Sequence, residues 1–204
     1  MEPFEQELRQ SGLSRIAGLD EVGRGALFGP VVAAAAVVDP LRTTKGVNDS
    51  KKLTASQRCE CFKLLVKDLD DWSIGIASAT EIDRLNISEA TRVAMLRAIE
   101  GLRKPPDYLL IDGHIELDVQ IPQRSLVKGD ARCLSIAAAS VLAKVARDTL
   151  VAGYARRVQG YGLSRNMGYG TLEHRRALVD QGPSEFHRRS FHVKGKLPFT
   201  ETDV

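Results

Sequence analysis

The sequence predicts a three-layer α/β or α+β protein with a helical extension at its C-terminal end. Apolar runs typical of strands alternate with helical patterns through the first 150 residues, and the last quarter holds helical pieces around glycine-rich turns. The chain has 204 residues, of which 43% are apolar and 27% charged. This composition suits a folded chain with a sizeable core, and we expect a single domain over residues 1–204.

The first fifty residues predict two strands. An apolar run over residues 15–19 ends at two acids. The run PVVAAAAVV over residues 30–38 is rich in β-branched residues and alanine, as in a buried strand, and Asp39-Pro40 ends it. A polar loop is expected over residues 41–52, and residues 1–14 form a short amphipathic lead-in.

Two capping boxes predict helices in the middle of the chain. Thr54-x-x-Gln57 begins a helix that runs to about residue 69, and Asn86-x-x-Glu89 precedes a second helix that a pair of prolines at 105–106 stops. The apolar face of the second helix is expected to contain Val93, Leu96, Ile99 and Leu102.

The remaining strands and a long helix follow from apolar periodicity. Strands are expected over residues 72–79, 108–111 and 120–127. An alanine-rich stretch without glycine or proline predicts a helix over residues 133–151. Active sites of open α/β sheets lie where strands end, so the acids at these strand ends are the candidates for chemistry.

Four acids stand at predicted strand ends. Asp20 and Glu21 follow the first strand, Asp112 ends another, and Asp130 closes a third before the long helix. Carboxylates packed together repel unless a cation lies between them. Hard oxygen ligands without a Cys/His cluster favour Mg²⁺ or Mn²⁺ over zinc. Glycine-flanked aspartates are also common turn formers, so spacing alone leaves that interpretation open.

Two glycine-rich segments are candidates for substrate binding. Glycines in Gly23-Arg24-Gly25 let backbone amides approach a ligand, and Arg24 can donate to a phosphate or sugar oxygen; an ordinary tight turn is the alternative. Tyr169 stands between two glycines, where it is free to stack on a sugar or base, or else belongs to the core. Thr171 caps the next helix in this interpretation.

Charge is distributed unevenly along the chain. Residues 1–150 hold 20 basic and 21 acidic side chains, whereas residues 151–196 hold 9 basic and 3 acidic ones. A basic C-terminal quarter suits a phosphate backbone, and a solvated helical face explains it equally well. The longest apolar stretches, residues 31–38 and 136–143, are too short to cross a membrane.

The cysteines and the N-terminus indicate the compartment. Cys59, Cys61 and Cys133 form neither a disulfide framework nor a zinc motif, so free thiols in a reducing compartment are expected. The first fifteen residues are polar and acidic, unlike a signal peptide. We therefore expect a cytoplasmic protein without a membrane partner.

Eight segments follow one another along the chain in an order typical of one protein family. They are GLDEVGRG at 18–25, GPVVAA at 29–34, NDSKKL at 48–53, IDG at 111–113, KGD at 128–130, SIAAASVLAKVARD at 135–148, GYGT at 168–171 and HRRSF at 187–191. With these segments the chain resembles bacterial ribonuclease HII, the type 2 ribonuclease H family. The resemblance runs from about residue 16 to residue 199, and no single segment would be decisive.

The resemblance implies a ribonuclease H-like fold: a mixed five-stranded sheet flanked by helices, with a catalytic core over about residues 15–150 and a helical substrate-binding extension over about 151–199. It implies a metal-dependent endoribonuclease that cleaves the RNA strand of RNA–DNA hybrids. Such an enzyme also cuts 5′ to single ribonucleotides in duplex DNA, leaving 3′-hydroxyl and 5′-phosphate ends. A monomer is expected, and a replication-fork protein is a conceivable partner that the sequence does not name.

The resemblance also assigns residues. The four metal-binding and catalytic carboxylates would be Asp20, Glu21, Asp112 and Asp130, holding two Mg²⁺ or Mn²⁺ ions around the scissile phosphate. Gly23, Arg24 and Gly25 would read the ribose 2′-hydroxyl. Tyr169 would stack on the adjoining deoxynucleotide sugar. Phosphate contacts would come from Lys51, Lys144, Thr171 and Arg188.

One departure and several alternatives accompany the resemblance. Many members have His-Lys where this chain has Asn166-Met167, which removes a positive charge near Tyr169. Ribonuclease HIII is the nearest alternative; it usually has Lys at the position of Arg24 and an additional N-terminal domain, for which the 15 residues before the first strand leave no room. The other alternative functions are another ribonuclease H-like nuclease, a catalytically silent nucleic-acid-binding module and a metallophosphatase for small esters.

Overall fold

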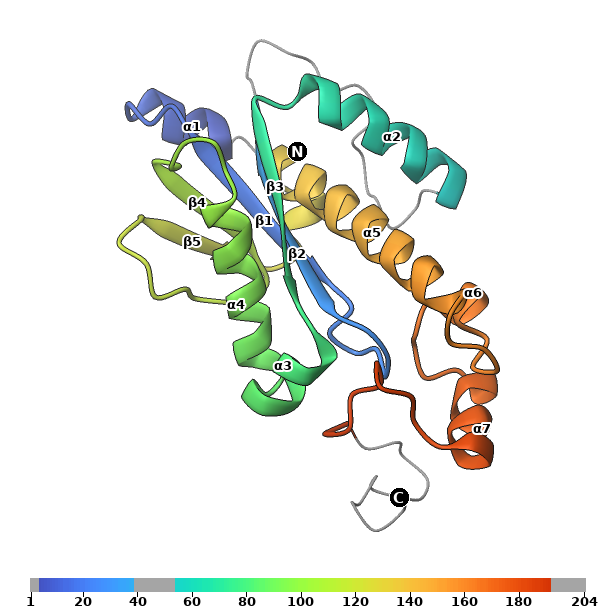
Figure 1. The fold of residues 1–204 in the computed structure, drawn as a ribbon. Helices are drawn as coiled ribbons and strands as arrows, with labels where there is room; N and C mark the ends of the chain where they lie inside the picture. Colours follow the sequence, from blue (N-terminus) through green and yellow to red (C-terminus); the bar gives the residue numbers. More distant parts are fainter. Residues whose placement is uncertain (1–3, 39–53, 192–204) are drawn as a thin grey trace.

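A mixed five-stranded sheet forms the centre of the protein (Figure 1). The structure is a computed structural model and describes residues 4–38 and 54–191. The strand order is β3-β2-β1-β4-β5, with β1–β2 and β2–β3 antiparallel and β1–β4 and β4–β5 parallel. The strands are β1 (Ile16–Val22), β2 (Val31–Val37), β3 (Asp71–Ala77), β4 (Tyr108–Asp112) and β5 (Gln123–Leu126). The expected sheet is confirmed.

Helices cover both faces of this sheet (Figure 1). Helix α4 packs on one face, and α2 and α5 pack on the other. The helices are α1 (Phe4–Gln10), α2 (Ala55–Asp68), α3 (Ala79–Leu85), α4 (Ile87–Glu100), α5 (Leu134–Ala155), α6 (Leu163–Asn166) and α7 (Leu172–Gln181), with a 3₁₀ turn at Gly129–Ala131. Over the described residues, none of them has the length and apolar character that crossing a membrane requires.

The central strand β1 lies directly against the beginning of α5. A Cβ on Gly18 would lie 2.2 Å from the carbonyl carbon of Ser135, so only glycine allows this approach. The first turn of α5 is capped from a distance, because the Glu5 carboxylate of α1 accepts bonds from the Ser135 amide (3.0 Å) and hydroxyl (2.9 Å). Together these contacts fix α5 beside the strand that carries Asp20.

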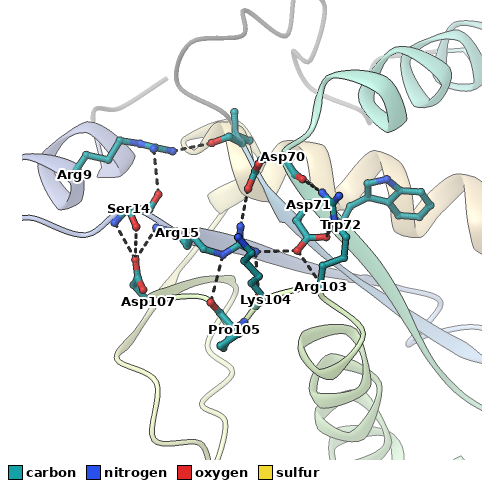
Figure 2. A network of polar contacts seen from close by, with 11 residues as sticks. Arg9, Ser14, Arg15, Asp70, Asp71, Trp72, Arg103, Lys104, Pro105 and Asp107 are labelled. Carbon is teal, nitrogen blue, oxygen red and sulfur yellow. Dashed lines mark hydrogen bonds and ion pairs between the residues drawn. The ribbon is translucent and has the colours of Figure 1, made fainter.

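The N-terminal end of β1 is fixed by an arginine network (Figure 2). The Arg15 guanidinium donates to Asp70 (2.7 Å), to Asp71 (2.9 Å) and to the carbonyl oxygens of Lys104 and Pro105. Burial opposes ionisation of Asp71, but the hydrogen bonds from Arg103 and Arg15 hold its pKa below the usual range. This network joins β1 to β3 and β4 at the end opposite to Asp20.

Most predicted elements are confirmed, and their bounds are adjusted. The capping box Thr54–Gln57 is present, and α5 extends four residues beyond the predicted end, through Gly153. Residues 123–126 alone form a strand within the predicted run 120–127. The polar loop expected over 41–52 lies outside the described residues.

One prediction about α4 was wrong and the other was incomplete. Asn86 caps the helix by accepting from the amides of Ser88 and Glu89, but the Glu89 side chain pairs with Arg92 instead of completing a box. The predicted apolar face is largely confirmed, because Leu102 is buried and Leu96 and Ile99 pack against the core, whereas Val93 is not among the core residues. The fully buried residues of the helix are Ala90, Thr91, Ala94, Met95 and Ala98. Gly75 explains the small ones, because a Cβ there would lie 1.9 Å from the Ala94 carbonyl oxygen.

Candidate active site

Four carboxylates come from one end of the sheet and from the turn before α5. The sequence predicted that Asp20 and Glu21 follow the first strand. In the structure both residues lie inside β1. Asp112 is the last residue of β4, which runs parallel to β1. Asp130 lies in the 3₁₀ turn that follows β5, and the preceding amide of Gly129 donates to Asp112 Oδ1 at 2.7 Å. That bond holds the Asp130 turn against the end of β4.

Three of these carboxylates interact electrostatically. Burial raises the pKa of Asp20 well above its usual range, the charges of Glu21 and Asp112 raise it further, and hydrogen bonds from the Ser140 hydroxyl and the Glu21 amide oppose the shift. Burial likewise raises the pKa of Glu21, which Arg24 partly offsets and Asp112 reinforces. The site thus brings together carboxylates whose negative charges repel one another, and Arg24 offsets this repulsion only in part.

The donor set suits a hard divalent cation. Glu21 Oε2 is buried and has no hydrogen-bond partner among the described residues, although a buried carboxylate oxygen normally has one. The other oxygen, Oε1, lies 3.4 Å from the Arg24 guanidinium. In the same described part of the chain, no three His, Cys, Asp or Glu side chains converge closely enough to form a complete ligand set. The fit therefore rests on the three interacting carboxylates and the unpartnered oxygen.

The Gly23–Gly25 loop follows directly from β1. Gly23 has φ +92°, and a Cβ there would lie 2.1 Å from Arg147 Nε, so this position requires glycine. Beyond the loop, Ala26 pairs with Tyr169 in an antiparallel bridge, and the Leu27 amide donates to the Gly168 carbonyl at 2.9 Å. The structure therefore brings the two glycine-rich segments together beside the carboxylates.

Comparisons with known proteins agree with this geometry. The family model described as Ribonuclease HII matches residues 17–194. The chain belongs to the ribonuclease HII family. It is 50% identical over 188 residues to Ribonuclease HII of Syntrophotalea carbinolica, covering 92% of this chain and 90% of the relative. It is 51% identical over 195 residues to Ribonuclease HII of Paracoccus denitrificans, covering 95% and 92%.

A solved structure extends the comparison to the fold. The crystal structure of ribonuclease H2 from Pyrococcus horikoshii OT3 superposes with a TM-score of 0.74 at 27% identity, covering 87% of this chain and 94% of that one. The ribonuclease H-like fold is thereby confirmed, and so is the assignment of the chain as a ribonuclease H-type endoribonuclease.

The other predicted site residues differ in how exposed they are and in whether the structure describes them. Lys144 is partly buried, pairs with Asp148 at 2.8 Å, and lies 5.9 Å from the centre of the Tyr169 ring. Thr171 is exposed and caps α7 by accepting from the His174 amide, as expected. Lys51 lies outside the described residues.

Arg188 differs most from its predicted place. It was expected to meet phosphate at the surface, but its side chain is 1% exposed. Its guanidinium donates to the carbonyl oxygens of Gly23 (2.7 Å), Arg24 (2.8 Å) and Gly29 (2.9 Å). Arg188 therefore holds the loop from inside the protein.

Sequence reasoning also missed Ser140 and Arg147, which lie seven residues apart on one face of α5. Arg147 is fully buried and donates to the carbonyl oxygens of Phe28 (3.0 Å), Pro30 (3.1 Å) and Met167 (2.9 Å). Ser140 and Arg147 are separated by two turns of the helix and so share one face. That face is otherwise apolar and rich in alanine, so the one arginine on it could have been predicted to be buried.

Asn166, the departure from the usual family pattern, has a structural role. Its side-chain amide donates to the Tyr161 carbonyl at 2.7 Å, and its Oδ1 accepts from the Gly168 amide at 2.8 Å. Met167 adopts the left-handed region, with φ +48°. Asn166 thus shapes the turn before Tyr169, and Met167 stands in that turn at the position where the usual lysine charge is missing.

A buried pair of histidines lies behind this turn. His174 and His187 are 0% and 2% exposed, and their Nε2 atoms are 2.9 Å apart. Burial lowers the pKa of both rings, that of His187 to about 3. Both imidazoles are therefore neutral in the folded protein at pH 7, whereas in the unfolded chain they take up protons below about pH 6.5.

The pair predicts a loss of stability in acid. Since the unfolded state binds more protons than the folded state below about pH 6.5, stability falls as the pH falls, by up to about 1.4 kcal/mol per pH unit for each histidine. Urea unfolding between pH 7.5 and 5 measures this slope. His187→Gln keeps a donor and an acceptor without titrating, so its slope should be smaller; equal slopes would show that the pair does not contribute.

Proposed function

We propose that this ribonuclease HII uses Asp20, Glu21, Asp112 and Asp130 to hold Mg²⁺ or Mn²⁺. It would cleave the RNA strand of RNA–DNA hybrids and cut 5′ to single ribonucleotides in duplex DNA, leaving 3′-hydroxyl and 5′-phosphate ends. The supporting observation is the buried, unpartnered Glu21 Oε2 within a group of interacting carboxylates. A cation in this group would relieve both the repulsion and the missing contact.

The bound cation would activate water and stabilise the charge of the leaving 3′-oxygen. The protein's contribution is to fix the carboxylates. Asp20 is oriented by the Ser140 hydroxyl and the Glu21 amide, and Asp112 is oriented by the Gly129 amide. Arg24 lies beside Glu21 Oε1, at the boundary between the carboxylates and the loop.

The Gly23–Gly25 loop is suited to reading a ribose 2′-hydroxyl. The buried Arg188 guanidinium donates to the Gly23 and Arg24 carbonyls on the inner side of the loop. Within the described part of the chain, the structure offers no acceptor to the Arg24 and Gly25 backbone amides. These amides are therefore available to a substrate oxygen, and a 2′-hydroxyl is the group that distinguishes RNA from DNA.

The other proposed contacts with the substrate are inferred from where each residue lies in the structure or in the sequence. Tyr169 would stack on the sugar of the adjoining deoxynucleotide, with Lys144 beside its ring to meet a phosphate. Thr171, at the exposed start of α7, would contact another phosphate. Lys51 remains a proposed phosphate contact from its place in the sequence. Residues 151–199 would form the substrate-binding extension.

Substituting Tyr169 tests the junction contact. Tyr169→Ala is expected to reduce kcat/KM at a single embedded ribonucleotide about tenfold, the value of one aromatic stack, and to affect a long hybrid less. Steady-state cleavage of both substrates measures the two losses. Tyr169→Phe keeps the ring and should behave nearly as the wild type on both. Equal losses on the two substrates for Tyr169→Ala would exclude a junction-sensing role.

We also propose that the enzyme acts in the cytoplasm, as a monomer on nucleic acid. Cys59, Cys61 and Cys133 form no disulfide in the described part of the chain, which suits a reducing compartment.

A further inference from the structure

A short C-terminal strap, residues 186–191, runs along the segment that follows the Gly23–Gly25 loop. The Gly29 amide donates to the Phe186 carbonyl at 2.9 Å, and the Arg188 amide donates to the Leu27 carbonyl at 2.9 Å. At its far end, the Asp83 carboxylate of α3 accepts from the Arg189 amide (3.0 Å), the Ser190 amide (2.9 Å) and the Ser190 hydroxyl (2.6 Å). The strap is therefore fixed at both ends.

Arg188 connects the strap to the inner side of the loop. All three of its guanidinium bonds go to backbone carbonyls. Burial and the nearby Arg147 lower its pKa to about 9, although the charges of Tyr169 and Asp83 act in the opposite direction. Burying a cation whose hydrogen bonds all go to neutral carbonyls is costly. The three carbonyls belong to the Gly23–Gly25 loop and to Gly29 in the segment that follows it.

His187, the preceding strap residue, connects to Tyr169. The Ser184 amide donates to His187 Nδ1 at 2.9 Å, so in the neutral ring the proton is on Nε2. His174 Nδ1 lies 3.0 Å from the Tyr169 carbonyl, which can only accept, so this nitrogen carries the proton and Nε2 of His174 accepts from His187. Hydrogen bonds thus run from the strap through both rings to the Tyr169 backbone.

We propose that the strap is a positioning device: Arg188 fixes the loop that reads the 2′-hydroxyl, and His187, through His174, fixes Tyr169, so that the strap sets the distance between the two substrate-reading elements. This rests on the proposed function. The two connections start from adjacent residues of one short segment. A change in the strap therefore alters the recognition of a ribonucleotide and of its neighbour together.

Binding selectivity tests the proposal without relying on cleavage. The measurement is the Kd of the full-length protein for an all-DNA duplex divided by its Kd for the same duplex with one ribonucleotide, in EDTA. Arg188→Lys keeps the charge but cannot reach three carbonyls. We expect it to reduce the selectivity ratio about tenfold, as for the loss of charge-assisted hydrogen bonds.

Arg15→Lys is the matched control. Arg15 is also an arginine with several hydrogen bonds, but it lies at the opposite end of β1 (Figure 2). Both variants should lower Tm, and only Arg188→Lys should lower the ratio. An unchanged ratio for Arg188→Lys, or an equal decrease for Arg15→Lys, would overturn the proposal.

Two further variants complete the test. Asp83→Ala releases the far end of the strap from a partly exposed site and should lower the ratio in the same direction, which covers the case that Arg188→Lys does not fold. If the strap joins the two elements, Arg188→Lys and Tyr169→Ala combined should lose less selectivity than the product of the single losses. Full multiplicativity would overturn the coupling. A wild-type ratio of one would instead contradict the proposed function itself.

Discussion

Asp20→Asn is expected to reduce cleavage about 10³-fold or more while the protein remains at least as stable as the wild type. The loss of rate follows from removing a proposed ligand of the cation, whose positive charge would stabilise the reacting phosphate. Asparagine has nearly the shape of aspartate and can still accept from Ser140. The fold should therefore not change.

The free energy of unfolding should increase because the surroundings of Asp20 disfavour its ionised carboxylate. Its pKa is raised by burial and by Glu21 and Asp112, so the ionised form at pH 7 is disfavoured in the folded state. The contribution of Asp20 to folding stability is therefore lost as the pH rises through its raised pKa, and a neutral side chain avoids this loss. A gain of about 1 kcal/mol in the free energy of unfolding is expected, as for other trade-offs between stability and activity.

Thermal unfolding with and without Mn²⁺ separates the two effects. Mn²⁺ should raise the Tm of the wild type, since a ligand that binds only the folded state stabilises it. The increase should be much smaller for Asp20→Asn. Asp118→Asn, an exposed aspartate in the segment after β4, is the matched control and should keep both the activity and the Mn²⁺ response. An Asp20→Asn protein with near wild-type cleavage would remove Asp20 from the site.

Gly18→Ala should destabilise the protein by about 3 kcal/mol, the upper range for forcing an extra carbon into a packed core. The new Cβ would meet Ser135 and Ile136 backbone atoms at 2.2 and 2.3 Å, and backbone cannot rotate away. The beginning of α5 must then move from β1. Asp20 lies two residues after Gly18, and Asp130 lies just before α5, so activity should fall as well.

Gly153→Ala is the matched control, because Gly153 is in α5 and a Cβ there has no neighbour within 4 Å. Alanine favours helix, so this variant should be stabilised by about 0.5–1 kcal/mol. Urea denaturation measures both changes. A Gly18→Ala protein as stable as the wild type would show that β1 and α5 are not in the close contact described.

The fold was largely predictable where local patterns decide it. The run at residues 30–38 became β2, and Thr54 and Gln57 formed their box, because both signals act through neighbours in sequence. The buried face of α4 was only partly predicted, because tertiary contact decides which residues are fully buried. Gly75 lets the helix approach β3 closely at Ala94 and Ala98, so small residues pack there beside the larger apolar ones.

The candidate carboxylates were recognised in the sequence from their places at strand ends, whereas the residues that orient them were not. Asp20 and Glu21 lie within β1 instead of after it, since strand pairing with β2 continues to Val22. Arginine in a sequence suggests a surface contact, whereas Arg147 and Arg188 are buried and bind backbone carbonyls. The place of Arg147 on an apolar helix face indicates that it is buried, but no pattern of nearby residue types identifies the acceptors of either arginine, because they belong to the backbone of distant loops.

With a divalent cation held by these carboxylates, the enzyme should cut beside a ribonucleotide that the Gly23–Gly25 loop reads. Cleavage of an end-labelled DNA duplex with one ribonucleotide, in Mg²⁺, Mn²⁺ and EDTA, beside the matched all-DNA duplex, tests the metal and the loop together. We predict a single cut 5′ to the ribonucleotide with either metal, and none in EDTA or in the all-DNA duplex. Cleavage in EDTA, or equal cleavage of both duplexes, would contradict this mechanism.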